Sequence, residues 1–489
     1  MSIIFEDLGL PDELQQLRQE SKECGVEFIQ DPISYDDFFR RFLLPNKPCL
    51  LGGNGIGNVI QHWQSINEWV QPNGTPDFDF LERQFGGATV PVANCGKVQY
   101  YAQPKQDMKF SEYLRYWRGH IATDYQSSQG CLYLKDWHFT RAFSDYEAYS
   151  TPIYFSSDWL NEYWDHLCNS GDDYRFVYMG PKHSWTPFHA DVFRSYSWSA
   201  NICGRKRWLL LPPGEESYLR DNLGNLVYDL NSSELHDGKK YPHSHQAREP
   251  LEVIQEAGQV IFVPSGWHHQ VFNLEDTISI NHNWLNGCNI DITWRFLQDE
   301  FKAVQKSIED CRDMDGWEEQ CQLIMKASTG MDYPEFFNFL HLVASNRLSM
   351  LSKLSHELKA KHNAEEGSCR LHSKTDINAQ GHSCAKSSEM EDGPEHSDTA
   401  RGVQQCLEDN APTTSTAASS LISAGGDEVG RWRKKYLIYD LWRVQQTLED
   451  LIRNKDFADI DTSRCAQEPT SLLQEILAHL KEWQIGNDT

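Results

Sequence analysis

The middle of the chain consists of short apolar runs separated by polar breaks. Five runs of six to eight residues are each bounded by Gly, Pro, Asn or Asp, and no convincing helix separates one run from the next. They are CLYLKDW (131–137), YRFVYMG (174–180), KRWLLLP (206–212), QVIFVP (259–264) and TISINHNW (277–284). Strands without crossover helices pair antiparallel. We therefore expect a mostly β core, a sandwich or barrel of the jelly-roll kind, with flanking α-helices.

Helical periodicity flanks this core on both sides. Residues 11–22 and 34–44 are typical of short helices, and two prolines soon after the second one end it before an apolar strand. Beyond the core, residues 292–305 and 335–359 place an apolar side chain at every third or fourth position. We expect these later helices to pack on the outside of the barrel.

The pattern divides the chain into five parts. They are an N-terminal helical and strand region leading into the barrel (1–130), the barrel (131–300), packing helices (301–360), a disordered low-complexity insert (361–430) and C-terminal helices (431–489). The insert has almost no aromatic side chain, so it cannot bury enough apolar area to offset chain entropy.

An apolar stripe with helical spacing follows the insert, and a further helix is expected at 471–484. The stripe consists of Tyr436, Tyr439, Val444, Leu448 and Leu451. It allows two arrangements, docking on the barrel or a homodimer through the C-terminal helices. Docking is favoured, because packing within one chain is the commoner use of such a stripe.

The net charge of −26 argues against direct contact with a nucleic-acid backbone, which needs a basic surface. Residues 361–430 carry 12 acidic against 5 basic side chains, so −19 of the charge lies elsewhere. An acidic body of this kind would attract basic or lysine-bearing protein partners, although simple solubility explains it equally well.

Neither the N-terminus nor any apolar run indicates secretion or a membrane span. The 13 cysteines are an odd, scattered set without a C-x-x-C pair, as expected of reduced thiols. We therefore expect a soluble, cytoplasmic protein without membrane contact. Four basic residues would also fit a nuclear signal, but the exposed start of a helix explains them better. They are Arg431, Arg433, Lys434 and Lys435.

Two candidate metal ligands stand two positions apart in HSWTPFHADVF. We place His189 and Asp191 at the end of a strand that begins near Tyr174, where residues i and i+2 project to the same face. The His-x-Asp pattern alone is common and is most often an accidental surface or loop pair. A metal site therefore needs a third ligand from elsewhere.

The segment GQVIFVPSGWHHQVFNL supplies that ligand. It predicts a strand, a tight turn and a second strand opened by His268 and His269. Strand alternation sends these histidines to opposite faces, so at most one normally reaches the site. We choose His269, because its register matches that of the single His in comparable barrels. A hydrogen-bonded core or turn histidine is the alternative for either one.

Two imidazoles and one carboxylate, with open positions on one side of the metal, favour Fe(II) and oxygen chemistry. Zinc would more usually show three His, or Cys. Three open positions fit a bidentate 2-oxo acid together with O2. Such chemistry oxidises an unactivated C–H bond that the protein holds near the metal.

A dicarboxylate cosubstrate needs a cation for its far carboxylate. In NICGRKRWLLLPPG, Lys206 shares a strand face with Trp208 and Leu210, whereas Arg205 and Arg207 point the other way. Periodicity leaves open which of the two faces is buried.

Several motifs in this order resemble the jumonji-C family. They are TPFHAD, GRKRWLLLPP, GQVIFVPSGWHHQVFNL and ISINHNW, and the resemblance covers about residues 35–300. It implies a cupin-like double-stranded β-helix, Fe(II), and 2-oxoglutarate and O2 as cosubstrates. It also makes His189, Asp191 and His269 the catalytic iron ligands and Lys206 the partner of the far carboxylate of 2-oxoglutarate.

The resemblance extends to the polar residues around the cosubstrate. Tyr133 and Thr186 match the family's hydroxyl donors to the far carboxylate. Asn281 stands where many relatives have Thr, and its amide can still donate a hydrogen bond. Ser199 replaces a more usual Asn near the metal.

Similar proteins of this subgroup are linked to hydroxylation of a lysine side-chain carbon in a translation-termination release factor. The resemblance therefore implies a lysine-bearing protein as the substrate. The chain lacks the zinc-finger and reader modules of histone-directed relatives, which favours a hydroxylase over a methyl-lysine demethylase. Both reactions begin with the same hydrogen abstraction, so the motifs do not separate them. A catalytically silent binding scaffold is a third alternative, and the intact ligand set speaks against it.

Two other groups of residues are weaker candidates for a metal site. Cys369 with His372, and His382 with Cys384, mimic zinc spacing but lie in the low-complexity insert. The stretch Pro242-His243-Ser244-His245 lies in a polar segment, and an exposed loop is the simpler interpretation.

Overall fold

The computed structural model describes residues 14–167, 172–372 and 426–485; side chains are described outside 357–372, 426–432 and 483–485. The chain divides into two compact units, one of residues 1–348 and 435–489 and one of residues 349–434. The barrel and the candidate site lie in the first unit. Most of the expected insert, residues 373–425, lies outside the described residues.

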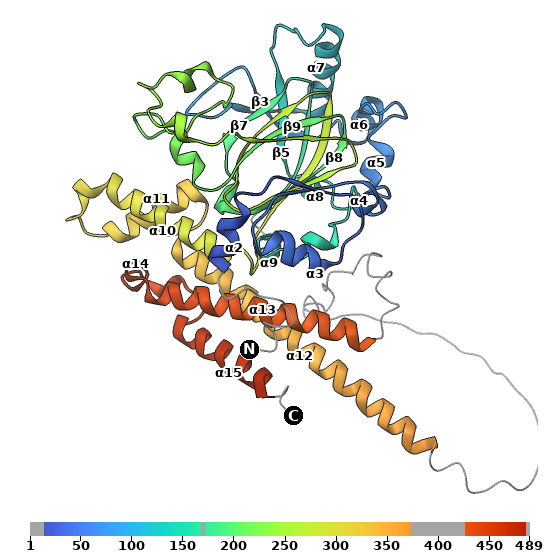
Figure 1. Ribbon diagram of the computed structural model, residues 1–489, viewed down its shortest axis with the longest axis vertical. Coiled ribbons are helices and arrows are strands. Elements are labelled where there is room, and N and C mark those ends of the chain that lie inside the picture. The colour runs from blue at the N-terminus through green and yellow to red at the C-terminus, as the bar shows by residue number, and fades with distance from the viewer. Residues whose placement is uncertain (1–13, 168–171, 373–425, 486–489) are drawn as a thin grey trace, which may run out of the picture. The chain divides into compact units, whose positions relative to one another are not determined.

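Two sheets form the barrel, as expected for the jelly-roll class (Figure 1). The strands are β1 (Glu27–Ile29), β2 (Cys49–Leu51), β3 (Thr89–Asn94), β4 (Lys105–Lys109), β5 (Leu132–Trp137), β6 (Arg175–Gly180), β7 (Trp185–His189), β8 (Tyr196–Cys203), β9 (Lys206–Leu211), β10 (Leu251–Gln255), β11 (Val260–Val263), β12 (His268–Asn273) and β13 (Thr277–Trp284). The nine-stranded sheet has the order β1-β2-β11-β8-β13-β6-β5-β3-β4, and the four-stranded sheet has the order β10-β9-β12-β7. Neighbouring strands pair antiparallel, apart from the parallel pair β1 and β2. Each of the five predicted runs contains a strand.

Helices flank the sheets on both sides in sequence. They are α2 (Leu14–Ser21), α3 (Tyr35–Phe38), the π-helical turn η1 (Phe39–Leu43), α4 (Gly53–Ile60), α5 (Gln64–Glu68), α6 (Phe78–Phe85), α7 (Phe110–Ala122), α8 (Phe139–Ala142), α9 (Trp159–His166), α10 (Ile290–Ser307), α11 (Trp317–Thr329), α12 (Tyr333–His372), α13 (Gly426–Arg453), α14 (Lys455–Ala458) and α15 (Pro469–Ile485). The expected helices are present. The periodicity did not indicate α11, nor α8 and α9, which lie between β5 and β6 where no helix was expected. Among the described helices, none has the length and apolar character needed to cross a membrane.

The expectation of one strand from Tyr174 to His189 is wrong. The segment forms two strands, β6 in the large sheet and β7 in the small sheet. Pro181 lacks the N–H that would continue the ladder, and His183 adopts the left-handed conformation with φ of 74°. The chain therefore turns a corner between the sheets just before the candidate ligands.

Strand β8 separates two environments. Trp198 packs into an aromatic layer on one face, where its ring stacks on Phe155 at 5.4 Å between centroids. Ser197 on the opposite face donates a hydrogen bond to Asp191. The polar face of β8 therefore faces the candidate site, and its apolar face forms core. Because polar and apolar residues alternate along β8, its sequence contains no apolar run that would predict a strand.

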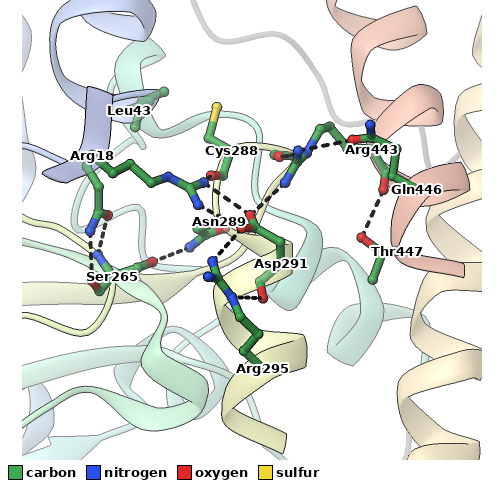
Figure 2. Close-up of polar contacts among 12 residues, drawn as sticks. Arg18, Leu43, Ser265, Cys288, Asn289, Asp291, Arg295, Arg443, Gln446 and Thr447 are labelled. Atoms are coloured by element: carbon green, nitrogen blue, oxygen red, sulfur yellow. Dashed lines mark hydrogen bonds and ion pairs between the residues drawn. The ribbon is translucent and has the colours of Figure 1, made fainter. Parts of the chain in front are cut away.

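A buried ionic cluster joins α2, α10 and α13 (Figure 2). Asp291 accepts hydrogen bonds from Arg18 at 2.7 Å, from Arg443 at 2.6 Å and from the exposed Arg295 at 2.7 Å. Burial raises the pKa of the Asp291 carboxyl, but the charges of Arg18 and Arg443 outweigh it and hold that pKa well below its ordinary value. The cluster fixes the last helical region against the end of the barrel.

The apolar stripe of α13 is buried within the chain. Tyr439, Val444, Leu448 and Leu451 are each at most 2% exposed, and the hydroxyl of Tyr439 lies 3.3 Å from the carbonyl oxygen of Gly287. The stripe therefore packs within the first unit, with Tyr439 against the segment that follows β13, which is the docked arrangement that its spacing favours. A homodimer through the C-terminal helices stays a prediction.

Candidate metal and cosubstrate site

Three candidate ligands converge at the edge of the small sheet. One ligand atom from each of His189, Asp191 and His269 lies within 4.8 Å of the others. His189 and His269 are direct cross-strand partners on β7 and β12, with ring centroids 4.4 Å apart. Asp191 follows in extended conformation, with φ of −60° and ψ of 155°. Within the described ranges, no other group of three His, Cys, Asp or Glu side chains has this geometry.

The hydrogen bonds of the two imidazoles leave one nitrogen of each for a metal. His189 Nδ1 lies 2.8 Å from the carbonyl oxygen of Pro187, and His269 Nδ1 lies 3.1 Å from that of Trp267. A carbonyl only accepts, so Nδ1 carries the proton and Nε2 presents its lone pair. Burial, reinforced by the neighbouring His269, lowers the pKa of His189 to about 4. Two neutral imidazoles and one carboxylate suit Fe(II).

Asp191 is held from the opposite sheet. Ser197 Oγ donates a hydrogen bond of 2.7 Å to its Oδ2, which leaves the other carboxylate oxygen for a metal. The chain then turns sharply, because Phe193 and Arg194 both adopt left-handed conformations with φ of 53° and 55°. Thr293 fixes this turn by donating to the carbonyl of Phe193 at 3.0 Å. Two such residues in succession cost free energy and often mark a functional turn.

A β-bulge brings Thr186 to the same face as His189. Simple alternation would place residues three apart on opposite faces. In the structure Thr186 pairs with Val271 while His189 pairs with His269, so three residues of β7 match two of β12. The extra residue rephases the strand. Thr186 and His189 therefore both face the barrel interior, where the metal and the cosubstrate are expected to bind.

Lys206 lies on the inner face of the small sheet and is 2% exposed. It pairs with Asn273 of β12, which alternates onto the same face as His269. Its Nζ lies 3.4 Å from Tyr133 Oη, and within the described part of the chain it forms no ion pair. Burial lowers the pKa of Lys206 to about 7. The question that periodicity left open is thus answered: Lys206 faces inward.

The neighbouring arginines face solvent. Arg205 pairs with Glu256 at 3.1 Å, and Arg207 pairs with Glu252 at 2.7 Å. Their exposure matches the expected alternation around Lys206.

Asn281 and Ser199 are cross-strand partners on β13 and β8. Ser199 stands two positions after Ser197 on β8 and therefore shares the interior face. Asn281 donates to Ser279 at 3.2 Å, and the buried hydroxyl of Ser199 has no hydrogen-bond partner among the described residues. Both side chains are placed for polar contacts inside the barrel, and the cosubstrate contact of Asn281 stays a prediction.

Sequence reasoning missed a second buried lysine. Lys135 follows Tyr133 by two positions on β5 and is 7% exposed. Its ammonium donates to the side chain of Gln103 at 3.0 Å, and Gln103 is anchored on the carbonyl of Trp185 at 3.0 Å. Burial lowers the pKa of Lys135, and its charge contributes to the lowered pKa of His189. The i, i+2 spacing from Tyr133 in LYLKDW was the available signal.

The weaker histidine candidates do not join the site. His243 and His245 are exposed, as expected for a loop. The side chains of Cys369 and His372, and all of His382 and Cys384, lie outside the described residues.

Comparison with known proteins agrees with this geometry. The Cupin-like domain family matches residues 35–289. The chain is 47% identical over 468 residues to the 2-oxoglutarate and iron-dependent oxygenase JMJD4 of Danio rerio, covering 96% of this chain and 95% of that protein. It is 57% identical over 340 residues to JMJD4 of Gallus gallus, covering 69% and 79%. The chain belongs to the JMJD4 family. The chain is also 43% identical to the arginine-specific demethylase JMJ20 of Arabidopsis thaliana, covering 67% and 71%.

Membership of the JMJD4 family makes this chain a 2-oxoglutarate and iron-dependent oxygenase with a cupin-like JmjC domain. The matched range contains His189, Asp191 and His269, the group that could hold the iron. The cofactors implied by the donor set and by the family are therefore the same.

Proposed function

We propose that this chain hydroxylates a lysine side-chain carbon in a substrate protein, with a translation-termination release factor as the expected substrate. The observation that carries the proposal is the convergence of His189, Asp191 and His269 in the barrel interior, on whose wall the buried Lys206 forms no ion pair with the described residues. A two-His, one-carboxylate set in the same interior as an unpaired cation suits Fe(II) together with a dicarboxylate. Membership of the JMJD4 family supports the same class of reaction.

Three of the site residues would bind the metal, and four others would bind the cosubstrate. His189, Asp191 and His269 would hold Fe(II), which with 2-oxoglutarate and O2 supplies the oxidising power to break an unactivated C–H bond. Lys206 would hold the far carboxylate of 2-oxoglutarate. Tyr133 in contact with Lys206, and Thr186 on the same inner face, would donate hydroxyl hydrogen bonds to it. Asn281 would add an amide from the opposite sheet. Because Lys206 is buried, this ion pair forms in a dry environment where it is strong.

Aromatic rings along β6 support a cationic side chain as the substrate. Tyr174, Phe176 and Tyr178 alternate on the face that carries Asn281 across β13, with 6.4 Å between neighbouring centroids. Tyr178 donates a hydrogen bond of 2.6 Å to Asp136, whose left-handed backbone (φ 62°) marks a bulge in β5. Aromatic faces cover the methylene stem of a lysine and attract its ammonium.

Asp136 also pairs with Lys105 of β4. A lysine ammonium is therefore compatible with the space beside this carboxylate. The acidic body of the protein would attract a lysine-bearing partner over a longer range.

Removal of an N-methyl group is the second candidate reaction. One relative in Arabidopsis thaliana is named as an arginine-specific demethylase, and it is 43% identical to this chain. Demethylation and hydroxylation begin with the same hydrogen abstraction, and they differ in which carbon lies near the metal. The same site would serve both.

Mass spectrometry separates these reactions. The full-length protein is incubated with Fe(II), 2-oxoglutarate, O2 and a release factor, in unmethylated and methylated forms. We expect one added oxygen on a lysine of the unmethylated protein, with succinate formed in equal amount. Loss of a methyl group without retained oxygen would establish the demethylase instead.

Two variants control this experiment. His189→Ala should abolish both succinate formation and substrate oxidation. His243→Ala changes an exposed histidine remote in sequence from the ligands and should retain both. Full activity of His189→Ala would contradict the assigned metal site, and tight partner binding without any turnover by the unmodified protein would indicate a scaffold.

A further inference from the structure

A cavity of about 410 Å³ adjoins the candidate iron ligand His189, and the proposed reaction leaves it unused. Its lining includes His189, Ala190, Phe188, Arg194, Arg220 and His268. The volume is in the range of pockets that bind small ligands, and is large enough to admit an acidic side chain together with part of its backbone. Any group in this cavity would lie beside the site of oxidation.

Two arginines of the lining form no ion pair with a described carboxylate. Arg194 lies over the ring of Phe296, 5.0 Å from its centroid, and its Nη1 is 3.5 Å from His268 Nε2. Arg220 donates to the carbonyl of Gly224 at 2.8 Å. In a chain with a net charge of −26, two such arginines in one cavity are unusual. A guanidinium presents a fork of donors that matches a carboxylate.

A buried imidazole of the same lining lies beside Arg194. His268 is 3% exposed, and its Nδ1 has no hydrogen-bond partner in the described structure. The oxygen of Glu216 is 3.7 Å away, too far for a hydrogen bond, and it accepts instead from the backbone of Gly214 at 2.6 Å. Nδ1 therefore faces Glu216 and the backbone of Gly266, which are not part of the cavity lining, whereas Nε2 faces Arg194. His268 contributes its buried ring to the cavity wall beside Arg194.

An exposed aromatic turn forms part of the same cavity wall. Tyr101 lines the cavity and is 60% exposed, and the adjacent Tyr100 is 92% exposed. Both are held in left-handed conformations, with φ of 59° and 51°, by the bridge between Gln99 and Ala102. Two strained, solvent-facing tyrosines are typical of a surface that contacts another protein.

We propose that this cavity receives the carboxylate of an Asp or Glu side chain of the substrate protein, near the residue that is oxidised. Arg194 and Arg220 bind the carboxylate, and the turn of Tyr100 and Tyr101 packs on the bound segment. This inference rests on the proposed function, in that the ligand is part of a polypeptide substrate. It adds a sequence preference that the metal site alone does not provide.

Peptide binding tests the preference without turnover. A peptide library with a fixed central lysine carries Asp or Glu, or Asn or Gln, at each flanking position. Binding to the full-length protein is measured with Fe(II) but without 2-oxoglutarate. We expect the acid to bind about tenfold more tightly than its amide at one flanking position, as for a charge-assisted hydrogen bond of about 1.5 kcal/mol.

Substitutions test which residues cause the preference for an acidic flanking residue. Arg220→Gln alone, and Arg194→Gln together with Arg220→Gln, should abolish it. Arg207→Gln is the matched control, because Arg207 pairs with Glu252 on the outer face of β9, and it should keep the preference. Thermal melting checks folding, and the exposed Arg220→Gln should melt as the parent does. The absence of an acid preference in the parent, or its survival in the double variant, overturns the inference.

Two further arms separate this inference from the proposed function and from a small-molecule ligand. A library with norleucine at the centre that binds as tightly as the lysine library, and keeps an acid preference sensitive to Arg220, would support the cavity while contradicting the lysine substrate. A raised KM for 2-oxoglutarate in Arg220→Gln, with peptide preference unchanged, would assign the cavity to a free dicarboxylate and overturn the inference.

Discussion

Lys206 Nζ lies 3.4 Å from Tyr133 Oη, and this contact spans the barrel interior from the four-stranded to the nine-stranded sheet. The ammonium and the hydroxyl therefore lie close together, so one carboxylate would accept hydrogen bonds from both. Because neither residue is exposed, the pair is positioned before the cosubstrate arrives. The contact therefore joins the two sheets at the proposed cosubstrate site.

Replacing the Lys206 cation should selectively weaken the binding of 2-oxoglutarate. Lys206→Met keeps the length of the side chain but removes its charge, so the KM for 2-oxoglutarate should rise by about tenfold to hundredfold, as for a charged hydrogen bond of about 1.5–3 kcal/mol. Arg205→Met changes an exposed neighbour on the opposite face and should leave that KM unchanged. An unaltered KM in Lys206→Met would remove Lys206 from the binding site.

The affinity for 2-oxoglutarate should depend on pH. The pKa of Lys206 is lowered to about 7 by burial, and a bound carboxylate would raise it. Below pH 7 the lysine is already charged, so affinity should be constant. Above pH 7 binding must take up a proton, so affinity should fall by up to tenfold per pH unit until the raised pKa is passed. Calorimetric titration between pH 6 and 9 measures this.

An arginine at the same position gives the matching control for the pH profile. Lys206→Arg carries a charge that does not titrate in this range. Its affinity, whatever its absolute value, should lose the decline above pH 7. A flat profile in the parent protein would show that Lys206 stays protonated without ligand.

Ser197 should contribute to metal affinity without touching the metal. Its hydroxyl fixes Oδ2 of Asp191 at 2.7 Å, and loss of such a contact typically weakens metal binding about tenfold to hundredfold. Anaerobic Fe(II) titration of Ser197→Ala measures this loss. Ser199→Ala removes a hydroxyl without a hydrogen-bond partner from the same strand face and should bind Fe(II) as the parent does. Equal affinity in both variants would contradict the positioning role.

The ionic cluster at Asp291 should dominate the stability of the docked C-terminal helices. Asp291→Asn leaves the buried Arg18 and Arg443 without their carboxylate and should cost about 3–5 kcal/mol of unfolding free energy. Arg295→Ala removes only a half-exposed partner and should cost less than about 1 kcal/mol. Urea denaturation at pH 7 compares the two.

The ionic cluster at Asp291 should also make the stability of the protein depend on pH in acid. The pKa of Asp291 is held below its ordinary value, so its stabilisation is present above the unfolded pKa and is lost as pH falls through the folded pKa. The stability difference between the parent and Asp291→Asn should therefore shrink in acid. A difference that is constant down to pH 2 would contradict the lowered pKa.

Local patterns predicted most of the barrel and its ligands. The apolar runs that became β9 and β13 are visible without any tertiary information, because strand alternation is a property of neighbouring residues. The spacing of His189 and Asp191 predicted two ligands on one face for the same reason. The corner at Pro181 and His183 was missed, because an apolar run alone does not show to which sheet it belongs.

The sequence by itself determined that His189 and Asp191 share one face, because strand alternation is a local property, and its ordered motifs indicated the jumonji-C family and hence the third ligand His269. Only the tertiary structure decided which face of β9 is buried, and hence that Lys206 meets Tyr133. It also decided that a bulge turns Thr186 inward and that Arg194, Arg220 and His268 share one cavity. These relationships depend on register between strands far apart in the chain, which only packing sets.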